Sequence, residues 1–212
     1  MTRKRDRAEI PRAARRLTGS ADAVSLIGVT DADRMPDPEK ALAALPRGGA
    51  LIWRAYGEAP DATRLRHISA NAKSKDCVVL IAGAACLARR LGTQGLHLPE
   101  RMLTRRYEKG SLLSLHGRPP GFTVTAACHS ERAVRAAARA GVSAVLISPV
   151  FPTPSHPGGK ALGILGFTRL AKLARALGLT PYALGGITSD TQIRRLLGSG
   201  AAGVAGVSLL SP

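Results

Sequence analysis

Eight short apolar runs recur along the chain, and most are separated by stretches with the spacing of amphipathic helices. Alternating strand-like and helix-like segments without a linker are typical of a parallel sheet covered by helices. Eight such units at this spacing predict an α/β fold, a single (β/α)8 TIM barrel. The runs lie at 24–30, 50–54, 78–81, 95–98, 122–126, 144–147, 181–184 and 203–206.

The length and composition fit one domain of this kind. Barrels of this class commonly occupy about 200 to 250 residues as one domain, and this chain has 212. Hydrophobic residues make up 45% and aromatic residues 3%, so the core must consist of Ala, Val, Leu and Ile, which favours parallel strands covered by helices. We predict a barrel domain over residues 19–212, preceded by a basic N-terminal extension with a short helix over residues 1–18.

The eighth apolar run ends close to Pro212, which leaves no room for a full eighth helix. A truncated eighth helix would leave part of the first strand uncovered, because each strand of such a barrel is normally covered by an outer helix. We therefore expect residues 8–17, or the partner subunit of a homodimer, to supply the missing cover.

The chain is strongly basic, with 31 Lys and Arg against 14 Asp and Glu, a formal net charge of +17. This charge suits polyanions or phosphorylated small molecules. The arginines are spread over segments that we interpret as exposed helix faces, and aromatic side chains that would stack on bases are scarce. A solvated basic surface is therefore favoured over nucleic-acid binding. Binding that weakens steeply with salt and is lost without residues 1–16 would support the nucleic-acid alternative.

No segment has the pattern of a membrane span or a secretory signal. No apolar run reaches about 18 residues, and the start MTRKRDRAEIPRAARRL lacks the apolar centre of a signal peptide. Cys77, Cys86 and Cys128 have no CxxC spacing, which fits reduced thiols better than a disulfide or zinc framework. We predict a cytoplasmic protein with no membrane partner.

A long polar loop follows the sixth apolar run. Residues 148–163 read SPVFPTPSHPGGKALG, and a loop of this length in a compact domain is usually a lid, a binding loop or disordered. Glycine turns follow the seventh and eighth runs, at 185–188 and 206–208. Glycines let backbone N–H groups approach an anion closely, and barrels often hold phosphate at these strands. We favour a phosphate site here over glycines that only turn the chain.

Polar side chains also lie at or just after the carboxyl ends of other strands of the predicted barrel, where active sites of this fold lie. They include Arg54, His97 and His129. An imidazole at a barrel mouth is a suitable general acid or base near neutral pH. His129 is the candidate for that role, and the alternative is that it caps the next helix or packs at the rim. His97 has a weaker case, and we expect a structural role for it.

The second half of the chain resembles a known family. Residues 149–155, the LGGIT turn at 184–188 and GAAGVAGVS at 200–208 are similar to the thiamine phosphate synthase and TenI (thiazole tautomerase) superfamily, and the similarity extends through 129–131. The resemblance implies a barrel that binds a thiazole phosphate. The matching positions are Thr153, Ser155, Gly186, Val207 and Ser208, with Gly185 beside them and His156 where synthases carry a Lys.

The residues that hold the pyrimidine pyrophosphate in synthases are largely replaced. Of their Gln-x-Arg-x-Lys pattern only Arg54 remains, and their Asn-Asp pair reads Ala82-Gly83 here. Their second magnesium-binding Asp falls near Met102 and their pyrophosphate-binding Ser on Ala127. Mg²⁺ needs oxygen ligands that these side chains lack. We expect no cofactor, with Mg²⁺ required only if synthase activity is retained.

The resemblance therefore favours the TenI branch, whose members isomerise a thiazole carboxylate phosphate to its aromatic tautomer without a metal ion. His129 matches the histidine that moves the proton, and Arg54 would pair with the substrate carboxylate. One alternative is a thiamine phosphate synthase that couples hydroxymethylpyrimidine pyrophosphate to thiazole phosphate with an altered pyrophosphate site. The other is a non-catalytic barrel that sequesters or senses a thiazole phosphate.

Overall fold

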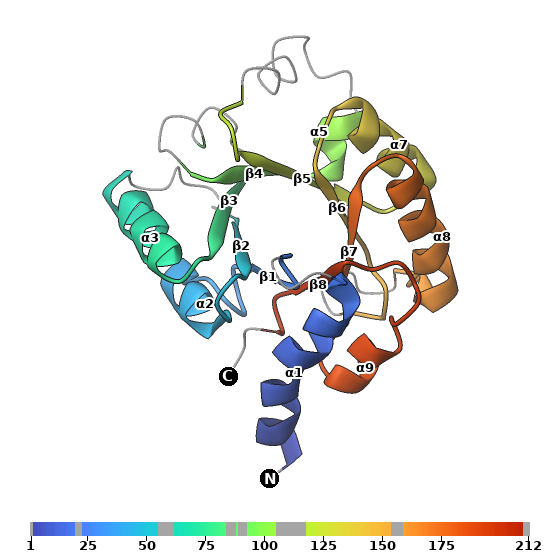
Figure 1. Ribbon diagram of the computed structural model, residues 1–212, viewed down its shortest axis with the longest axis horizontal. Coiled ribbons are helices and arrows are strands. Elements are labelled where there is room, and N and C mark those ends of the chain that lie inside the picture. The colour runs from blue at the N-terminus through green and yellow to red at the C-terminus, as the bar shows by residue number, and fades with distance from the viewer. Residues whose placement is uncertain are drawn as a thin grey trace.

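Eight parallel strands close into a barrel in the computed structural model (Figure 1). Neighbouring strands pair in chain order, and β1 pairs with both β2 and β8, which closes the sheet. The predicted (β/α)8 fold is confirmed. The strands are β1 (Leu26–Val29), β2 (Ala50–Trp53), β3 (Val78–Ala82), β4 (Gly95–Leu98), β5 (Thr123–Cys128), β6 (Ala144–Ile147), β7 (Thr180–Leu184) and β8 (Gly203–Gly206).

The structure describes residues 2–19, 23–54, 62–83, 88, 93–104, 118–153 and 159–209, with the backbone alone for 2–8 and 104. The helices of these ranges surround the barrel (Figure 1). They are α1 (Thr2–Thr18), α2 (Pro38–Ala44), α3 (Ala62–Ser74), α5 (Glu100–Thr104), α7 (Glu131–Arg139), α8 (Gly163–Ala176) and α9 (Asp190–Arg194). None of them is both long and apolar enough to cross a membrane.

The strands are short and apolar because both of their faces are covered. Every residue of β1, β2, β6 and β8 is buried. Successive side chains of a strand point to opposite faces, so one set fills the barrel and the other packs under the helices. Ala, Val, Leu and Ile make up most of this core, as the composition predicts, and Cys77 and Cys128 are buried within it as free thiols.

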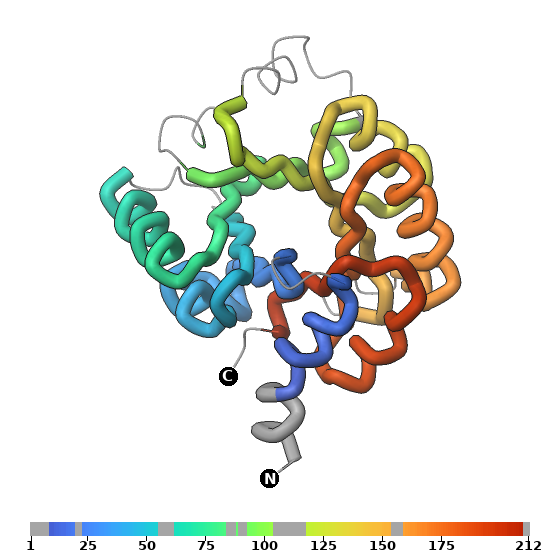
Figure 2. Tube along the Cα trace, in the orientation of Figure 1, coloured from blue at the N-terminus to red at the C-terminus, as the bar shows by residue number. Residues whose placement is uncertain are grey.

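Helix α1 occupies the position where an eighth outer helix would lie. It packs against β8, β1 and α9, and Figure 2 shows it beside the C-terminal elements of the barrel. Ile10, Ala13 and Ala14 are buried in this contact, while Arg12 faces solvent. Residues 8–17 thus pack against the first strand within the same chain, which is one of the two expected sources of its cover.

Side-chain caps fix where several helices begin. Asp37 accepts a hydrogen bond from the backbone N–H of Glu39 at 3.0 Å, and Pro38 occupies the first turn of α2. Ser130 caps α7 by accepting a hydrogen bond from the N–H of Ala133 at 3.2 Å. The turn from β5 into α7 therefore spans only His129 and Ser130, which holds His129 at the barrel mouth.

Candidate active site at the mouth of the barrel

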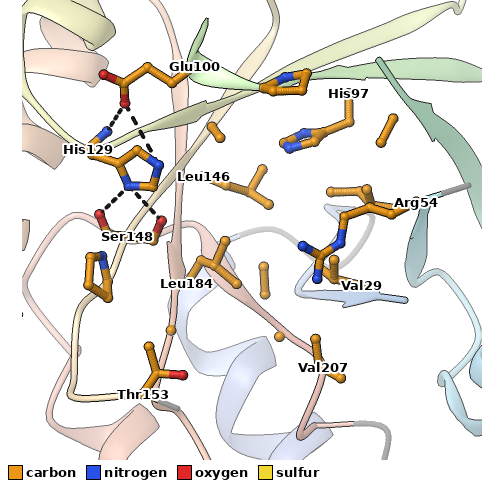
Figure 3. A pocket seen from close by; sticks show the side chains of 18 of the residues that line it. Val29, Arg54, His97, Glu100, His129, Leu146, Ser148, Thr153, Leu184 and Val207 are labelled. Carbon is orange, nitrogen blue, oxygen red and sulfur yellow. Dashed lines mark hydrogen bonds and ion pairs between the residues drawn. The ribbon is translucent and has the colours of Figure 1, made fainter. Parts of the chain in front are cut away.

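A cavity of about 530 Å³ opens at the C-terminal ends of the strands (Figure 3). Each of the eight strands contributes one apolar side chain or a histidine to its lining. These residues are Val29, Ile52, Ala82, His97, Ala127, Leu146, Leu184 and Ala205. The segments that leave the strands contribute polar side chains to the same lining: Arg34, Arg54, Glu100, Arg101, His129, Ser148, Thr153 and Ser208.

Seven of the residues predicted for the site line this one cavity. They come from five different strand ends and are brought together by the barrel: Arg54, His129, Thr153, Gly185, Gly186, Val207 and Ser208. The other two, Ser155 and His156, lie outside the described residues. The arrangement gives the predicted residues a common pocket, and their roles in it remain predictions.

One wall of the cavity joins the loop after β6 to the turn after β7. The N–H of Val150 donates to the carbonyl of Leu184 at 2.9 Å, and the N–H of Phe151 donates to that of Gly185 at 3.0 Å. Gly186 has a positive φ of 71°, and a Cβ there would lie 2.5 Å from the carbonyl oxygen of Pro152. A glycine is therefore required at 186 by the close approach of the loop.

Gln192, in the short helix α9, holds the segment after β7 in place. Its Oε1 accepts a hydrogen bond from the N–H of Thr188 at 2.7 Å, and its Nε2 donates to the carbonyl of Gly186 at 3.0 Å. The turn is thus held by a side chain four to six residues away. The sequence patterns do not single out Gln192, because it supports the turn from a helix and does not follow a strand end.

His129 has one ring nitrogen committed to the protein. Its Nδ1 lies 2.8 Å from the carbonyl oxygen of Ser148 and 3.2 Å from the Ser148 hydroxyl. A carbonyl oxygen only accepts hydrogen bonds, so Nδ1 carries the proton and Nε2 presents its lone pair. Nε2 is consequently the atom of this ring that can take up a proton from a ligand.

Glu100 is a site residue that the sequence patterns did not predict. Its Oε2 accepts a hydrogen bond from the backbone N–H of His129 at 2.7 Å and lies 3.9 Å from His129 Nε2. Among the described residues that line the cavity, Glu100 is the sole acid. The signal that could have identified it is its position, since only Pro99 separates it from the end of β4.

Two arginines on the other side of the cavity share one carboxylate. Arg34 contacts Asp31 through Nε and an Nη, both at 3.1 Å, and Arg54 reaches the same carboxylate at 3.4 Å. Arg54 is fixed further by its Nε, which donates to the carbonyl of Thr30 at 2.8 Å. The hydrogen bonds from Arg34 lower the pKa of Asp31, so the cluster is a carboxylate with two guanidinium groups and a net positive charge.

His97 is buried, yet its ring reaches the cavity. Its Nδ1 lies 2.8 Å from the hydroxyl of Thr125, and burial, with a smaller effect of Arg54, lowers its pKa to about 4. The ring is therefore neutral at neutral pH. The expected structural role fits this burial, but His97 also forms part of the surface that a ligand would contact.

The described residues do not fit a Mg²⁺ ion at the positions that the family resemblance assigns to it. Ala82, Gly83 and Ala127 line the cavity and offer no side-chain oxygen, and Met102 is buried outside it. Asp31 is engaged with two arginines and Glu100 with His129. Among the described residues, no three His, Cys, Asp or Glu side chains are grouped so that they could hold a metal ion.

Comparison with known proteins gives a family match over most of the chain. The model described as thiamine monophosphate synthase, TMP-TENI, matches residues 26–210. The chain is 28% identical to "Putative thiamine-phosphate synthase 2" of Aquifex aeolicus over 68% of this chain and 72% of that protein. It is 31% identical to "Putative thiamine-phosphate synthase" of Geobacter sulfurreducens over 62% of this chain and 58% of that protein, less than two thirds of its length.

Solved structures share the fold. Thiamine phosphate pyrophosphorylase from Pyrococcus furiosus superposes with a TM-score of 0.65 at 19% identity, over 91% of this chain and 86% of that one. An HpcH/HpaI aldolase from Desulfitobacterium hafniense superposes with a TM-score of 0.57 at 15% identity, over 88% and 86%. At such identities the likeness concerns the barrel alone, since barrels of one architecture host many chemistries.

Proposed function

This chain belongs to the thiamine monophosphate synthase family, and from that membership we propose that it binds a thiazole phosphate and acts as a TenI-like thiazole tautomerase that needs no metal ion. The observation that carries the proposal is the state of His129. Its Nδ1–H is held by the Ser148 carbonyl, so Nε2 is the ring nitrogen that can act as a base at the rim of this cavity, where the described His, Cys, Asp and Glu side chains form no group of three that could hold a metal ion.

The proposed reaction needs one group that first takes and then returns a proton. Tautomerisation moves a proton from one carbon to another and changes nothing else in the composition of the substrate. His129 Nε2 takes the proton as the first C–H bond breaks, and the imidazolium then gives a proton to the second carbon. A single imidazole is sufficient for both steps.

The walls of the cavity suit the two anionic ends of such a substrate. The phosphate is assigned to the side of Thr153, Gly186 and Ser208, where glycine turns bring backbone N–H groups close to the cavity. The carboxylate is assigned to Arg54, whose cluster with Arg34 and Asp31 is net positive. Figure 3 shows His129 and Arg54 on different sides of the cavity with Thr153 below them, so the three assigned groups face one common space.

The test is to assay tautomerisation of the thiazole carboxylate phosphate by the wild type and by His129→Asn. Asparagine keeps an N–H donor near the Nδ1 position and removes Nε2, so ligand affinity should be retained while kcat falls about 10²- to 10⁴-fold. Isothermal titration with the aromatic product measures the affinity. Equal rates for the two proteins, with binding intact, would overturn the role of His129, and equal rates no higher than the uncatalysed one would show that the barrel binds a thiazole phosphate without catalysing its tautomerisation.

A second candidate function is thiamine phosphate synthase with an altered pyrophosphate site. The observation that favours it is that the two curated relatives are named as thiamine-phosphate synthases. Release of pyrophosphate from hydroxymethylpyrimidine pyrophosphate and thiazole phosphate, dependent on added Mg²⁺, would establish this function and exclude the tautomerase as the main activity. The missing oxygen ligands at Ala82, Gly83 and Met102 make us expect no such release.

A further inference from the structure

Glu100 lies in contact with the proposed catalytic residue and has no part in the proton transfers proposed for His129. It opens α5, and Pro99 alone separates it from β4. One of its oxygens, Oε2, accepts the backbone N–H of His129 at 2.7 Å and lies 3.9 Å from Nε2 of the same residue (Figure 3). The carboxylate therefore faces both the backbone and the reactive ring atom of His129.

The charge of the His129 ring changes at the nitrogen that faces this carboxylate. The Ser148 carbonyl fixes the proton on Nδ1, so the second proton can bind only at Nε2. A proton on Nε2 then lies close to Glu100 Oε2, and the two groups form an ion pair that is absent while the ring is neutral. The contact is thus stronger in the protonated intermediate than in the resting enzyme.

The other charges at the mouth make such a partner necessary. The described lining carries three guanidinium groups, those of Arg34, Arg54 and Arg101. Asp31 neutralises part of the charge of the first two. A positive imidazole is disfavoured beside like charges and favoured beside an opposite one, and Glu100 supplies the negative charge on the described wall next to His129.

We propose that Glu100 is a positioning residue for His129: it orients the imidazole and stabilises the imidazolium that exists while the proton resides on Nε2. This inference rests on the proposed tautomerase function. In the step concerned, the C–H bond breaks, its electron pair passes into the conjugated system of the substrate, and the proton moves to Nε2. The proton then forms the new C–H bond, and Glu100 remains a carboxylate throughout.

The central experiment is to compare the kinetics of Glu100→Gln with the wild type. The amide oxygen of Gln can still accept the N–H of His129, so the substitution removes the charge and keeps the hydrogen bond. We expect kcat to fall about tenfold to a hundredfold, which is less than the loss expected when the general acid–base itself is removed. KM and the thermal midpoint should change little, because Glu100 has no assigned contact with the ends of the substrate.

Two further variants separate charge from structure. Glu100→Asp keeps the charge on a shorter side chain and should recover part of the lost kcat. Glu131→Gln removes a negative charge that is also near the mouth but lies on the exposed side of α7, where it pairs with Arg135 at 2.7 Å. Its kcat should equal that of the wild type, which shows that the effect belongs to Glu100 and not to the net charge.

The failure of this inference can be told apart from the failure of the proposed function. An active wild type with an equally active Glu100→Gln variant overturns the inference alone, and so does an equal loss of kcat and thermal midpoint in both Glu100 variants. If the wild type does not tautomerise the substrate, the orienting role is tested by crystal structures of the wild type and Glu100→Ala. The His129 ring should leave the Ser148 carbonyl in the variant, and an unchanged ring position overturns the role of Glu100.

Discussion

His97 is a neutral imidazole enclosed at the base of the cavity, and its titration connects the site to the stability of the fold. Burial keeps the charged form unfavourable, the guanidinium of Arg54 adds to this effect, and together they lower the pKa to about 4. The hydroxyl of Thr125 satisfies Nδ1 at 2.8 Å. A residue in this state supports the shape of the cavity without adding a charge to it at neutral pH.

We expect the free energy of unfolding to fall as the pH is lowered from about 7 to about 4. In the unfolded chain His97 binds a proton with a pKa near 6.5, while the folded protein excludes it until about pH 4. The contribution of His97 to the free energy of unfolding is fully present above the pKa of the unfolded chain and is lost as the pH falls towards 4. The size of the pKa shift corresponds to roughly 3 kcal/mol. Urea denaturation at several pH values measures it. A His97→Gln variant with the wild-type pH dependence would contradict the assignment.

Gly186 offers a second test at the residue scale. The backbone of Gly186 has a positive φ, and a Cβ there would also lie 2.5 Å from the carbonyl oxygen of Pro152. Gly198 has a positive φ too, of 76°, but nothing lies within 4 Å of its Cβ position. Gly198→Ala should cost about 1 kcal/mol from the backbone alone, and Gly186→Ala at least about 2 kcal/mol more. Urea denaturation of both variants gives the difference, and equal costs would show that the loop yields without penalty.

The turn between β5 and α7 shows how elements place the proposed base. The strand ends at Cys128, the helix begins at Glu131, and Ser130 caps the helix by accepting the N–H of Ala133. His129 is left as the residue between the last strand position and the cap, so its side chain has little freedom to leave the mouth. The sequence leaves two roles open for His129, proton transfer or the cap of the next helix, and in the structure Ser130 provides that cap.

Helix α1 is the element whose contribution to stability is most directly testable. Ala14 is fully buried against the barrel and Arg12 is exposed on the same helix. Ala14→Glu should lower the free energy of unfolding by about 2 to 4 kcal/mol, since it buries a charge where a methyl group fits, while Arg12→Glu should change it by less than about 0.5 kcal/mol. Urea denaturation compares the two. Similar small effects would mean that α1 adds no cover to the barrel.

At the scale of the whole molecule, the chain carries a large excess of positive charge. The formal net charge is +17, and several described ion pairs, such as Arg47 with Asp76, lie on the exposed surface. Excess charge of one sign destabilises a compact state by self-repulsion, and salt screens it.

We expect the free energy of unfolding in urea to rise when NaCl is increased from about 20 mM to about 200 mM, because the Debye length shortens over this range. The measurement needs no ligand and uses the wild-type protein. A fall in stability over the same range would indicate that favourable ion pairs outweigh the repulsion between the arginines.

The barrel and much of the candidate site can be predicted from the amino-acid sequence. Eight apolar runs with helical spacers can bury both of their faces only in a closed parallel sheet, and the carboxyl ends of parallel strands meet at one mouth. That rule places Arg54, His129, Gly186 and Ser208 in one group, because each lies at or just after the carboxyl end of an apolar run. All four line the cavity.

Which side chains meet within that mouth depends on the tertiary structure. Glu100 and His129 are 29 residues apart, and their contact depends on the register between β4 and β5 together with the turn into α5. The contact of Arg54 with Asp31 depends on the pairing of β1 with β2, and the seat of α1 against β8 and β1 follows from the closure of the sheet between its first and last strands. Local sequence patterns encode the elements and their order, whereas pairwise contacts of a few ångströms depend on packing that no local pattern specifies.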